Sequence, residues 1–240
     1  MASPERDSTL VRKTVGATFR RTVKPAYTGA RDLLSHLLFE RRSGIRTSEV
    51  VRLEDLGLAG EDRWYYAPSG WLALRRIMPR REVSRDDVFI DLGSGMGRAV
   101  YQAARYPFKR VIGVELSKEL NDIAIENLEH ASGRLVCKDV ELVNSDVLDY
   151  EIPDDVTVVY LANPFTGTIF SRVIDMLKES LERSPRLLRI IYVNPLEEYI
   201  LLGKGAKLVR KVRGLRPSRE WSRSNAIRLY TLSPGRDAER

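Results

Sequence analysis

The sequence predicts an α/β fold in which a mostly parallel sheet carries helices on both faces. Three observations predict it. From residue 88 onward, short apolar segments rich in β-formers alternate with helical patterns. The first four of these segments lack polar alternation, as strands buried on both faces do. A glycine-rich turn follows the first segment and opens a helix. With 240 residues, 43% of them hydrophobic, the chain fits one sizeable domain with a small extension.

The elements follow from local patterns. Strands are expected at 88–92, 110–115, 140–144, 156–162 and 187–193, and helices at 97–106, 117–131, 167–183 and 195–202. The segments 206–213 and 226–232 have no helix between them, so they are expected to pair as an antiparallel hairpin. Upstream, leucine spacing predicts a helix over 31–42, and Ser69 is expected to cap a helix from about Gly70 to Met78.

Charge is distributed unevenly along the chain. Residues 1–46 carry a net charge of +6 and residues 204–223 carry +7, whereas residues 47–203 carry −7. Such basic segments favour an anionic partner, unless they are simply solvated surface. Residues 1–63 are expected to form a basic arm with a helical extension, and residues 64–240 the α/β domain.

Composition excludes several classes of protein. No apolar run approaches the roughly 20 residues of a membrane span, and no signal peptide is recognisable. Cys137 is the only cysteine, and the chain has two histidines, so neither a disulfide nor a zinc site is expected. We therefore expect a cytoplasmic protein without metal and without integral membrane association.

The most informative motif is a glycine-rich turn. It reads Asp91-Leu-Gly93-Ser-Gly95-Met-Gly97-Arg98. Glycine is needed where the chain adopts a positive φ angle or where the backbone approaches a ligand closely. A turn of this kind between a strand and a helix predicts a nucleoside cofactor whose charged end lies against the turn.

Polar residues end the next three strands as well. Glu115 ends the second strand, 22 residues after Gly93, where such folds place an acid that binds ribose hydroxyls. Asp146 follows the third strand and Asn163 the fourth. Because ligands of these sheets gather at the carboxyl ends of the strands, the four residues including Asp91 predict one site along one edge.

The turn also distinguishes between two cofactors. A dinucleotide site has glycine where Arg98 stands, and it has no acid before the first glycine. S-adenosylmethionine is cationic and has no pyrophosphate, so Asp91 suits it. The sequence thus favours methyl transfer, and a nicotinamide-dependent oxidoreductase is the alternative from another enzyme class.

These motifs resemble the class I S-adenosylmethionine-dependent methyltransferases over about residues 64–232. The resemblance implies a Rossmann-like, seven-stranded, mostly parallel sheet with a C-terminal antiparallel hairpin. It also implies that Glu115 holds the ribose and that Asp146 with the Val147 backbone contacts adenine. The remaining cofactor contacts implied are the loop residues Asp91, Gly93, Ser94, Gly95 and Gly97, together with Leu116.

A second similarity is to the non-SET histone-lysine methyltransferases. It is carried by Asp91–Arg98, by Val158–Phe165 and by Glu220–Leu232. Tyr66-x-Pro68-Ser69 is similar to the segment that those enzymes fold over the cofactor, which makes Tyr66 a further candidate contact. Helices and loops differ, and no segment maps onto their lysine channel. The similarity therefore implies shared architecture and amine chemistry, without implying a histone substrate.

Two residues are candidates for catalysis. Asn163-Pro164-Phe165 is similar to the Asn-Pro-Pro-Tyr of amino-group methyltransferases but lacks the second proline. Methyl transfer mainly requires positioning of the nucleophile and exclusion of water. We expect Asn163 to orient the acceptor and Phe165 to pack on it, the alternative being a plain turn that caps the next helix.

The expected function is methyl transfer to a nitrogen or oxygen nucleophile, with a small molecule favoured as acceptor. A protein lysine or an RNA is the alternative acceptor, guided by the basic segments 1–46 and 204–223. A binding module that has lost activity is a third class, which the presence of Asp91, Glu115 and Asn163 disfavours.

Overall fold

The structure is a computed structural model that describes residues 30, 33, 36–49, 51, 68–213 and 226–234. The chain divides into two compact units, Met1–Arg42 and Ser43–Arg240. The described part of the first unit includes a π-helical turn, η2 (His36–Glu40), followed by α3 (Arg41–Ser43), which ends in the second unit. The domain boundary expected at residue 63 lies outside the described residues. All that follows concerns the second unit.

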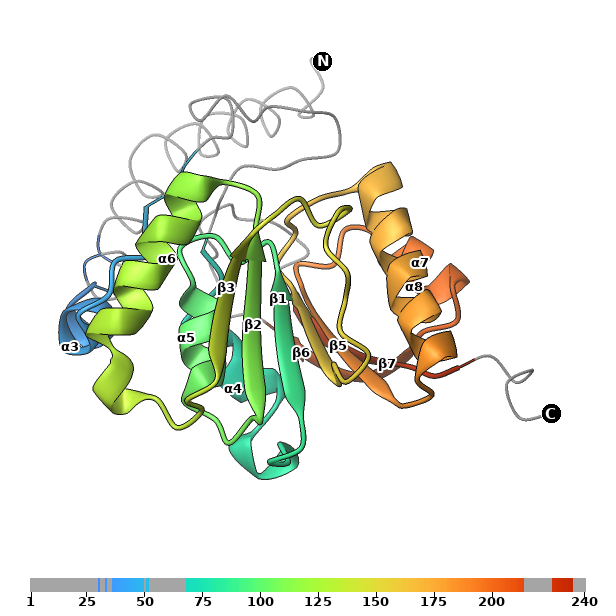
Figure 1. Ribbon diagram of the computed structural model, residues 1–240, viewed down its shortest axis with the longest axis horizontal. Coiled ribbons are helices and arrows are strands. Elements are labelled where there is room, and N and C mark those ends of the chain that lie inside the picture. The colour runs from blue at the N-terminus through green and yellow to red at the C-terminus, as the bar shows by residue number, and fades with distance from the viewer. Residues whose placement is uncertain are drawn as a thin grey trace, which may run out of the picture. The chain divides into compact units, whose positions relative to one another are not determined.

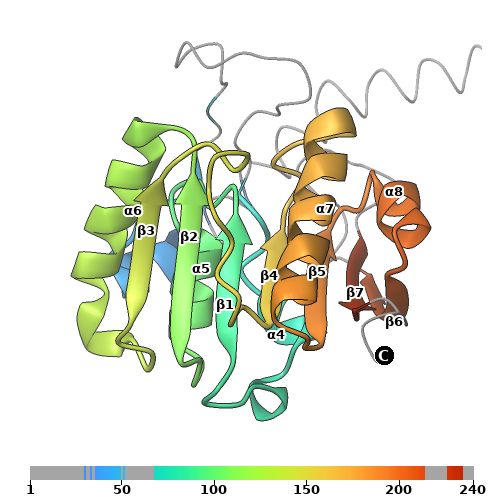
Figure 2. The ribbon, with the colours of Figure 1, turned by 45° about the vertical axis from the view of Figure 1, so that its right-hand side comes forward.

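One seven-stranded sheet forms the centre of this unit (Figures 1 and 2). Its strands are β1 (Val88–Leu92), β2 (Arg110–Glu115), β3 (Val140–Asn144), β4 (Val158–Leu161), β5 (Leu188–Val193), β6 (Lys207–Arg213) and β7 (Ala226–Leu232). Their spatial order is β3-β2-β1-β4-β5-β7-β6. The first five strands are parallel, and β7 is antiparallel to both β5 and β6. The predicted sheet, with its C-terminal antiparallel hairpin, is confirmed.

Helices cover both faces of the sheet, as Figure 1 shows. On one face lie α4 (Ala73–Ile77), α5 (Arg98–Ala104) and α6 (Lys118–His130), and on the other α7 (Gly167–Arg183) and α8 (Glu198–Gly203). Two short 3-10 turns, η3 (Arg80–Glu82) and η4 (Ser132–Arg134), complete the described elements. Within the described ranges, no helix has the length and apolarity needed to cross a bilayer.

The packing of β1 explains its unbroken apolar pattern. Phe89 belongs to the core beneath α4 and α5, whereas Val88, Ile90 and Leu92 belong to the core beneath α7, and all four are 0% exposed. Successive side chains point to opposite faces of a strand, so a strand covered on both faces needs apolar residues on both. Asp91 is the exception, and it lies next to the carboxyl end of the strand.

Two expected helix starts are wrong, because α8 begins at Glu198 rather than at residue 195, and α4 begins after Gly70. α4 begins at Ala73, its N-cap position is Leu72, and no side chain caps it. A turn closed by the bond from the Ala73 N–H to the Gly70 carbonyl precedes the helix. Ser69 lies before this turn and does not cap the helix, and its own carbonyl accepts a hydrogen bond from Arg98.

Candidate active site

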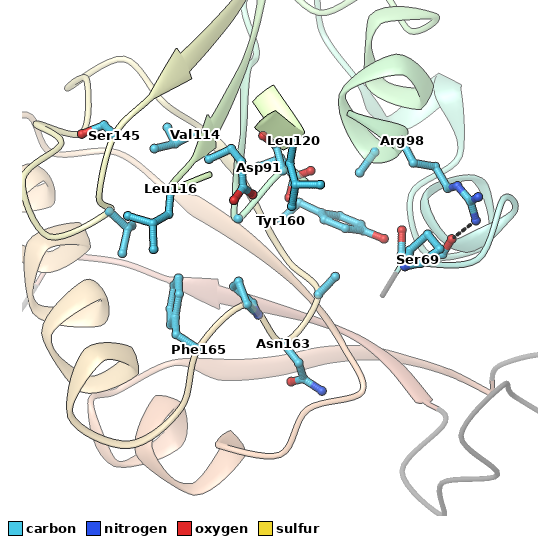
Figure 3. Close-up of a pocket in the computed structure, with 18 of the residues that line it drawn as sticks. Ser69, Asp91, Arg98, Val114, Leu116, Leu120, Ser145, Tyr160, Asn163 and Phe165 are labelled. Carbon is cyan, nitrogen blue, oxygen red and sulfur yellow. Dashed lines mark hydrogen bonds between the residues drawn. The ribbon is translucent and has the colours of Figure 1, made fainter. Parts of the chain in front are cut away.

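A cavity opens at the carboxyl ends of β1, β2, β3 and β4 (Figure 3). Most of the predicted site residues line it: Asp91, Gly93, Ser94, Glu115, Leu116, Asp146, Val147, Asn163 and Phe165. Gly95 and Gly97 shape the glycine loop without lining the cavity, and Tyr66 lies outside the described residues. The structure thus brings residues from four strands to one edge, as their positions at strand ends predict.

The glycine loop is held in a conformation that needs its glycines. Gly93, Gly95 and Gly97 have φ angles of 84°, 54° and 79°, the left-handed region that other residues rarely enter. The N–H groups of Gly93 and Ser94 both donate to the Val114 carbonyl, at 2.9 and 3.0 Å. These bonds fasten the loop to β2, and Gly97 then forms the N-cap of α5.

Gly93 lies directly against the turn that follows β4. A Cβ atom added at Gly93 would lie 2.2 Å from the Cβ atom of Pro164, a separation that real side chains do not tolerate. The loop predicted to bind the cofactor and the turn predicted to face the acceptor are therefore in van der Waals contact through a glycine.

Glu115 holds the glycine loop as well as lining the cavity. Its Oε2 accepts the N–H of Gly95 at 2.7 Å, and its Oε1 accepts the N–H of Ser117 at 2.9 Å. The side chain is buried, and burial raises its pKa, although these backbone hydrogen bonds act in the opposite direction. A carboxylate has about four acceptor positions, so both oxygens can still accept bonds from ribose hydroxyls.

Asp91 is the most unusual charge in the site. It is 3% exposed, and its Oδ1 has no hydrogen-bond partner among the described residues. Burial, and secondly the nearby charge of Glu115, raise its pKa well above the ordinary value. A buried carboxyl oxygen without a partner is costly unless a ligand supplies one. S-adenosylmethionine carries an ammonium and a sulfonium, and both would stabilise the ionised form.

The turn after β3 closes the cavity beside Leu116. Asp146 accepts the N–H of Leu148 on its Oδ1 at 3.0 Å, which shapes the turn. The Ser145 N–H donates to the Glu115 carbonyl at 3.0 Å, and the Asn144 side chain donates to the same carbonyl at the same distance. The ends of β2 and β3 are thereby tied together, which suits the adenine contact implied for Asp146 and Val147.

Asn163 and Phe165 lie across the cavity from Asp91 (Figure 3). Asn163 has a φ angle of 55°, and its amide, which points away from Asp91, has a buried Oδ1 without a partner in the described residues. Phe165 is 4% exposed and packs on Phe170, with ring centroids 6.3 Å apart. The N-cap position of α7 belongs to Thr166, not to Asn163.

Several cavity residues were not predicted as site residues. The polar ones among them are Ser69, Arg98, Ser145 and Tyr160. Tyr160 lies in β4 directly beside Asp91 of β1, and burial raises the pKa of its hydroxyl, so it stays neutral. Its role depends on strand register, which no local pattern reveals. Arg98 follows the glycine loop directly, and this position is a signal that sequence reasoning could have used.

Comparisons with known proteins agree with this geometry. A family model described as histone methylation protein DOT1 matches residues 71–193, just over half of the chain. The chain is 31% identical over 121 residues to a protein-lysine N-methyltransferase of Saccharolobus islandicus, covering 49% of this chain and 68% of that protein. It is 29% identical over 99 residues to the H3 lysine-79 specific histone-lysine N-methyltransferase of Drosophila melanogaster. That match covers 38% of this chain and 5% of that much longer protein.

A solved structure supports the fold. The RNA methyltransferase of Salinibacter ruber, crystallised with S-adenosyl-L-homocysteine, superimposes with a TM-score of 0.50 and 23% identity, covering 72% of this chain and 100% of that one. At this identity the likeness shows the fold alone. The family match, in contrast, spans the glycine loop and the strand ends that surround the cavity. The chain therefore belongs to the family of the histone methylation protein DOT1, and it is an S-adenosylmethionine-dependent methyltransferase.

Proposed function

We propose that this methyltransferase acts on the side-chain amine of a protein lysine. The sequence alone favours a small molecule as acceptor, with lysine or RNA as alternatives. The relative from Saccharolobus islandicus, described as a protein-lysine N-methyltransferase, moves the proposal to lysine. The observation that carries the proposal is the buried amide oxygen of Asn163, which has no partner among the described residues and suits an N–H donor.

The cofactor contacts belong to the proposal too. We assign the donor side of the cavity to Asp91, Gly93, Ser94, Glu115, Leu116, Asp146 and Val147 because they line one continuous cavity. When bound, S-adenosylmethionine supplies an electrophilic methyl group on a cationic sulfur. Asn163 and Phe165 form the side across from Asp91, where they position the amine and keep water out.

The attacking amine must be uncharged, so the ammonium of the substrate must first lose a proton. The residues that line the cavity show whether the protein supplies a base for this step. The described residues that line the cavity include no histidine, lysine or cysteine, and its carboxyl groups, those of Asp91, Glu115 and Asp146, belong to the side that we assign to the methyl donor. Tyr160 is a poor base because burial raises the pKa of its hydroxyl, so that it stays protonated. We therefore expect the ammonium to lose its proton to water before the transfer. The rate at subsaturating acceptor should rise with pH towards the lysine pKa of about 10.4.

Replacing Asn163 by alanine should lower kcat by about 10–100-fold. The variant loses one hydrogen bond between neutral groups, and with it the alignment of the amine that this bond provides. The Kd for S-adenosylhomocysteine should change less than about threefold, since Asn163 faces away from Asp91. Turnover and calorimetric binding measure the two effects.

The matched control is Asn194→Ala. Asn194 directly follows β5, precedes a proline as Asn163 does, and has a φ angle of 53°, but it does not line the cavity. Both substitutions therefore replace an asparagine that has a positive φ angle. Only Asn163→Ala removes the amide of a residue that lines the cavity. Equal turnover in the two variants would contradict the role of Asn163.

The acceptor class is tested by offering lysine-containing proteins, total RNA and small amines with radiolabelled S-adenosylmethionine. We expect label in protein, a mass increase of one methyl group on lysine in peptide mass spectra, and loss of both in Asn163→Ala. Label in RNA alone, or in small amines alone, would overturn the lysine proposal.

Exposed basic side chains on one edge strand of the sheet are a feature that would suit RNA as the acceptor. Strand β6 lies at the sheet edge and exposes Lys207, Lys211 and Arg213. Arg210 of the same strand is engaged internally, with Nη1 donating to Glu82 at 2.9 Å. An RNA affinity that falls steeply with salt would accompany the RNA outcome of the acceptor test.

A further inference from the structure

Arg98 is a buried arginine at the end of the glycine loop. It is the first residue of α5, directly after Gly97, and it is 6% exposed. A buried guanidinium is costly unless hydrogen bonds and aromatic faces replace its water. The contacts of Arg98 therefore indicate what its burial achieves.

The guanidinium joins two segments that are distant in sequence from α5. Its Nε donates to the hydroxyl of Thr47 at 2.8 Å, and its Nη2 donates to the hydroxyl of Ser48 at 2.9 Å. Its Nη1 donates to the backbone carbonyl of Ser69 at 3.0 Å (Figure 3). Its Cζ also lies 4.6 Å from the centroid of the Trp71 ring.

One of these two segments forms a wall of the cavity. Pro68 and Ser69 line it together with Arg98, at the end towards which the Tyr160 hydroxyl points (Figure 3). Because the Ser69 contact is made through a backbone carbonyl, it holds the path of the chain itself. Arg98 thus links the position of this wall to the first turn after the glycine loop.

The other segment, which we call the strap (Ser43–Ser48), has anchors besides Arg98. The Tyr101 hydroxyl donates to the Ser43 hydroxyl at 3.1 Å. The side chain of Asn127 accepts the N–H of Arg46 at 2.7 Å and donates to its carbonyl at 2.8 Å. Loss of Arg98 therefore leaves the strap attached at two places, while the Ser69 carbonyl loses its guanidinium partner.

We propose that Arg98 is a positioning residue for the methyl donor. By holding the Pro68–Ser69 wall against the start of α5, it keeps that end of the cavity in shape for S-adenosylmethionine. It acts through Ser69. This role is independent of the acceptor, so it can be tested whether or not lysine is the substrate.

The main test compares Arg98→Met with Arg105→Met. Arg105 follows α5, is exposed, and lies over an aromatic ring as Arg98 does, with its Cζ 5.8 Å from the Tyr101 centroid. We expect Arg98→Met to raise the calorimetric Kd for S-adenosylhomocysteine about tenfold or more, and the KM for S-adenosylmethionine similarly. The kcat and the KM for the acceptor should stay within about twofold. Arg105→Met should match the unmodified protein throughout.

A second pair of variants separates the wall from the strap. The double variant Thr47→Val with Ser48→Ala removes the strap hydroxyls and keeps the Ser69 bond, so we expect its Kd to change less than about threefold. Arg98→Lys keeps the charge but cannot form the fork of bonds, so its Kd should lie between those of Arg98→Met and the unmodified protein.

Two results would overturn the proposal. One is a Kd for S-adenosylhomocysteine in folded Arg98→Met within twofold of the unmodified value. The other is a double strap variant that reproduces the whole loss. Should Arg98→Met fail to fold, Arg98→Lys decides: an unchanged Kd counts against the role of Arg98, and a raised Kd with an unchanged kcat supports it.

Discussion

Replacing Gly93 by alanine should abolish binding of S-adenosylhomocysteine, raising its Kd by more than about 100-fold. Two costs combine at this position. Alanine is disfavoured at the φ angle of 84°, by about 1–2 kcal/mol. Its Cβ would also lie 2.2 Å from the Cβ of Pro164, so either the glycine loop or the turn after β4 must move. Calorimetric binding and thermal unfolding measure the consequences.

The control for Gly93→Ala is Gly133→Ala. Gly133 lies in η4, does not have a positive φ angle, and a Cβ added there would meet no atom within 4 Å. Its substitution should change the free energy of unfolding by no more than about 0.5 kcal/mol and leave binding intact.

A double variant tests whether Pro164 is the cause. In Gly93→Ala with Pro164→Gly, the opposing Cβ is gone and the backbone strain remains, so part of the lost stability should return. A non-zero coupling energy in this double-mutant cycle supports the contact. Additive losses, or nearly normal binding by Gly93→Ala alone, would contradict it.

Asp91→Asn should stabilise the free protein while weakening its binding of S-adenosylmethionine. The Asp91 carboxyl is buried, has an oxygen without a partner among the described residues, and lies near the charge of Glu115. A neutral amide of the same shape removes the cost of ionising it. The same change removes the anion that suits a cationic ligand, which we expect to raise the Kd about 10–100-fold.

The contribution of Asp91 to the stability of the free protein and its contribution to the affinity for S-adenosylmethionine should depend on pH with opposite signs. Since folding raises the pKa of Asp91, the folded state binds more protons than the unfolded state above the ordinary pKa. Its contribution to the free energy of unfolding is therefore fully present below pH of about 4 and is lost as pH rises through the folded-state pKa. S-adenosylmethionine favours the ionised carboxyl, so affinity should rise over the same window.

Asp149→Asn provides the comparison for this pH dependence. Asp149 lies in the turn after β3, at the same edge of the sheet as Asp91, but it is exposed. Thermal unfolding and calorimetric titrations from pH 5 to pH 8 should show a growing stability advantage for Asp91→Asn alone. An Asp91→Asn protein that is less stable at pH 8, or that binds as tightly as the unmodified one, would refute the assignment.

Local patterns predict the parallel part of the fold well because its strands are buried on both faces. The apolar run of β1 and the amphipathic spacing of α7 both end where the expected segments end. Ser69 shows the limit of such reasoning. A serine before a helical pattern predicts a cap, but here the carbonyl of Ser69 bonds to Arg98, a partner that no local pattern could identify.

In the candidate site, too, local patterns predict some residues, whereas others depend on partners that are distant in sequence. Asp91, Glu115, Asp146 and Asn163 each lie at or just beyond the carboxyl end of a strand, and parallel strand ends share one edge, so their convergence could be predicted. Tyr160 could not, because its place beside Asp91 depends on the register between β1 and β4. The second anchor of Glu115, on the N–H of Gly95, likewise depends on the three-dimensional path of the loop.

The contact between Gly93 and Pro164 also joins two parts of the chain that we expect to be exchangeable. Strands β1, β2 and β3 and the turns after them carry the residues that we assign to the methyl donor, and this part of the sequence is complete before β4 begins. The turn after β4 carries Asn163 and Phe165, the two residues that we assign to the acceptor. A chimaera that replaces the later part by that of a relative should keep its methyl donor and change its acceptor. We expect such an exchange to work only if position 93 remains glycine, because the turn after β4 packs directly against it.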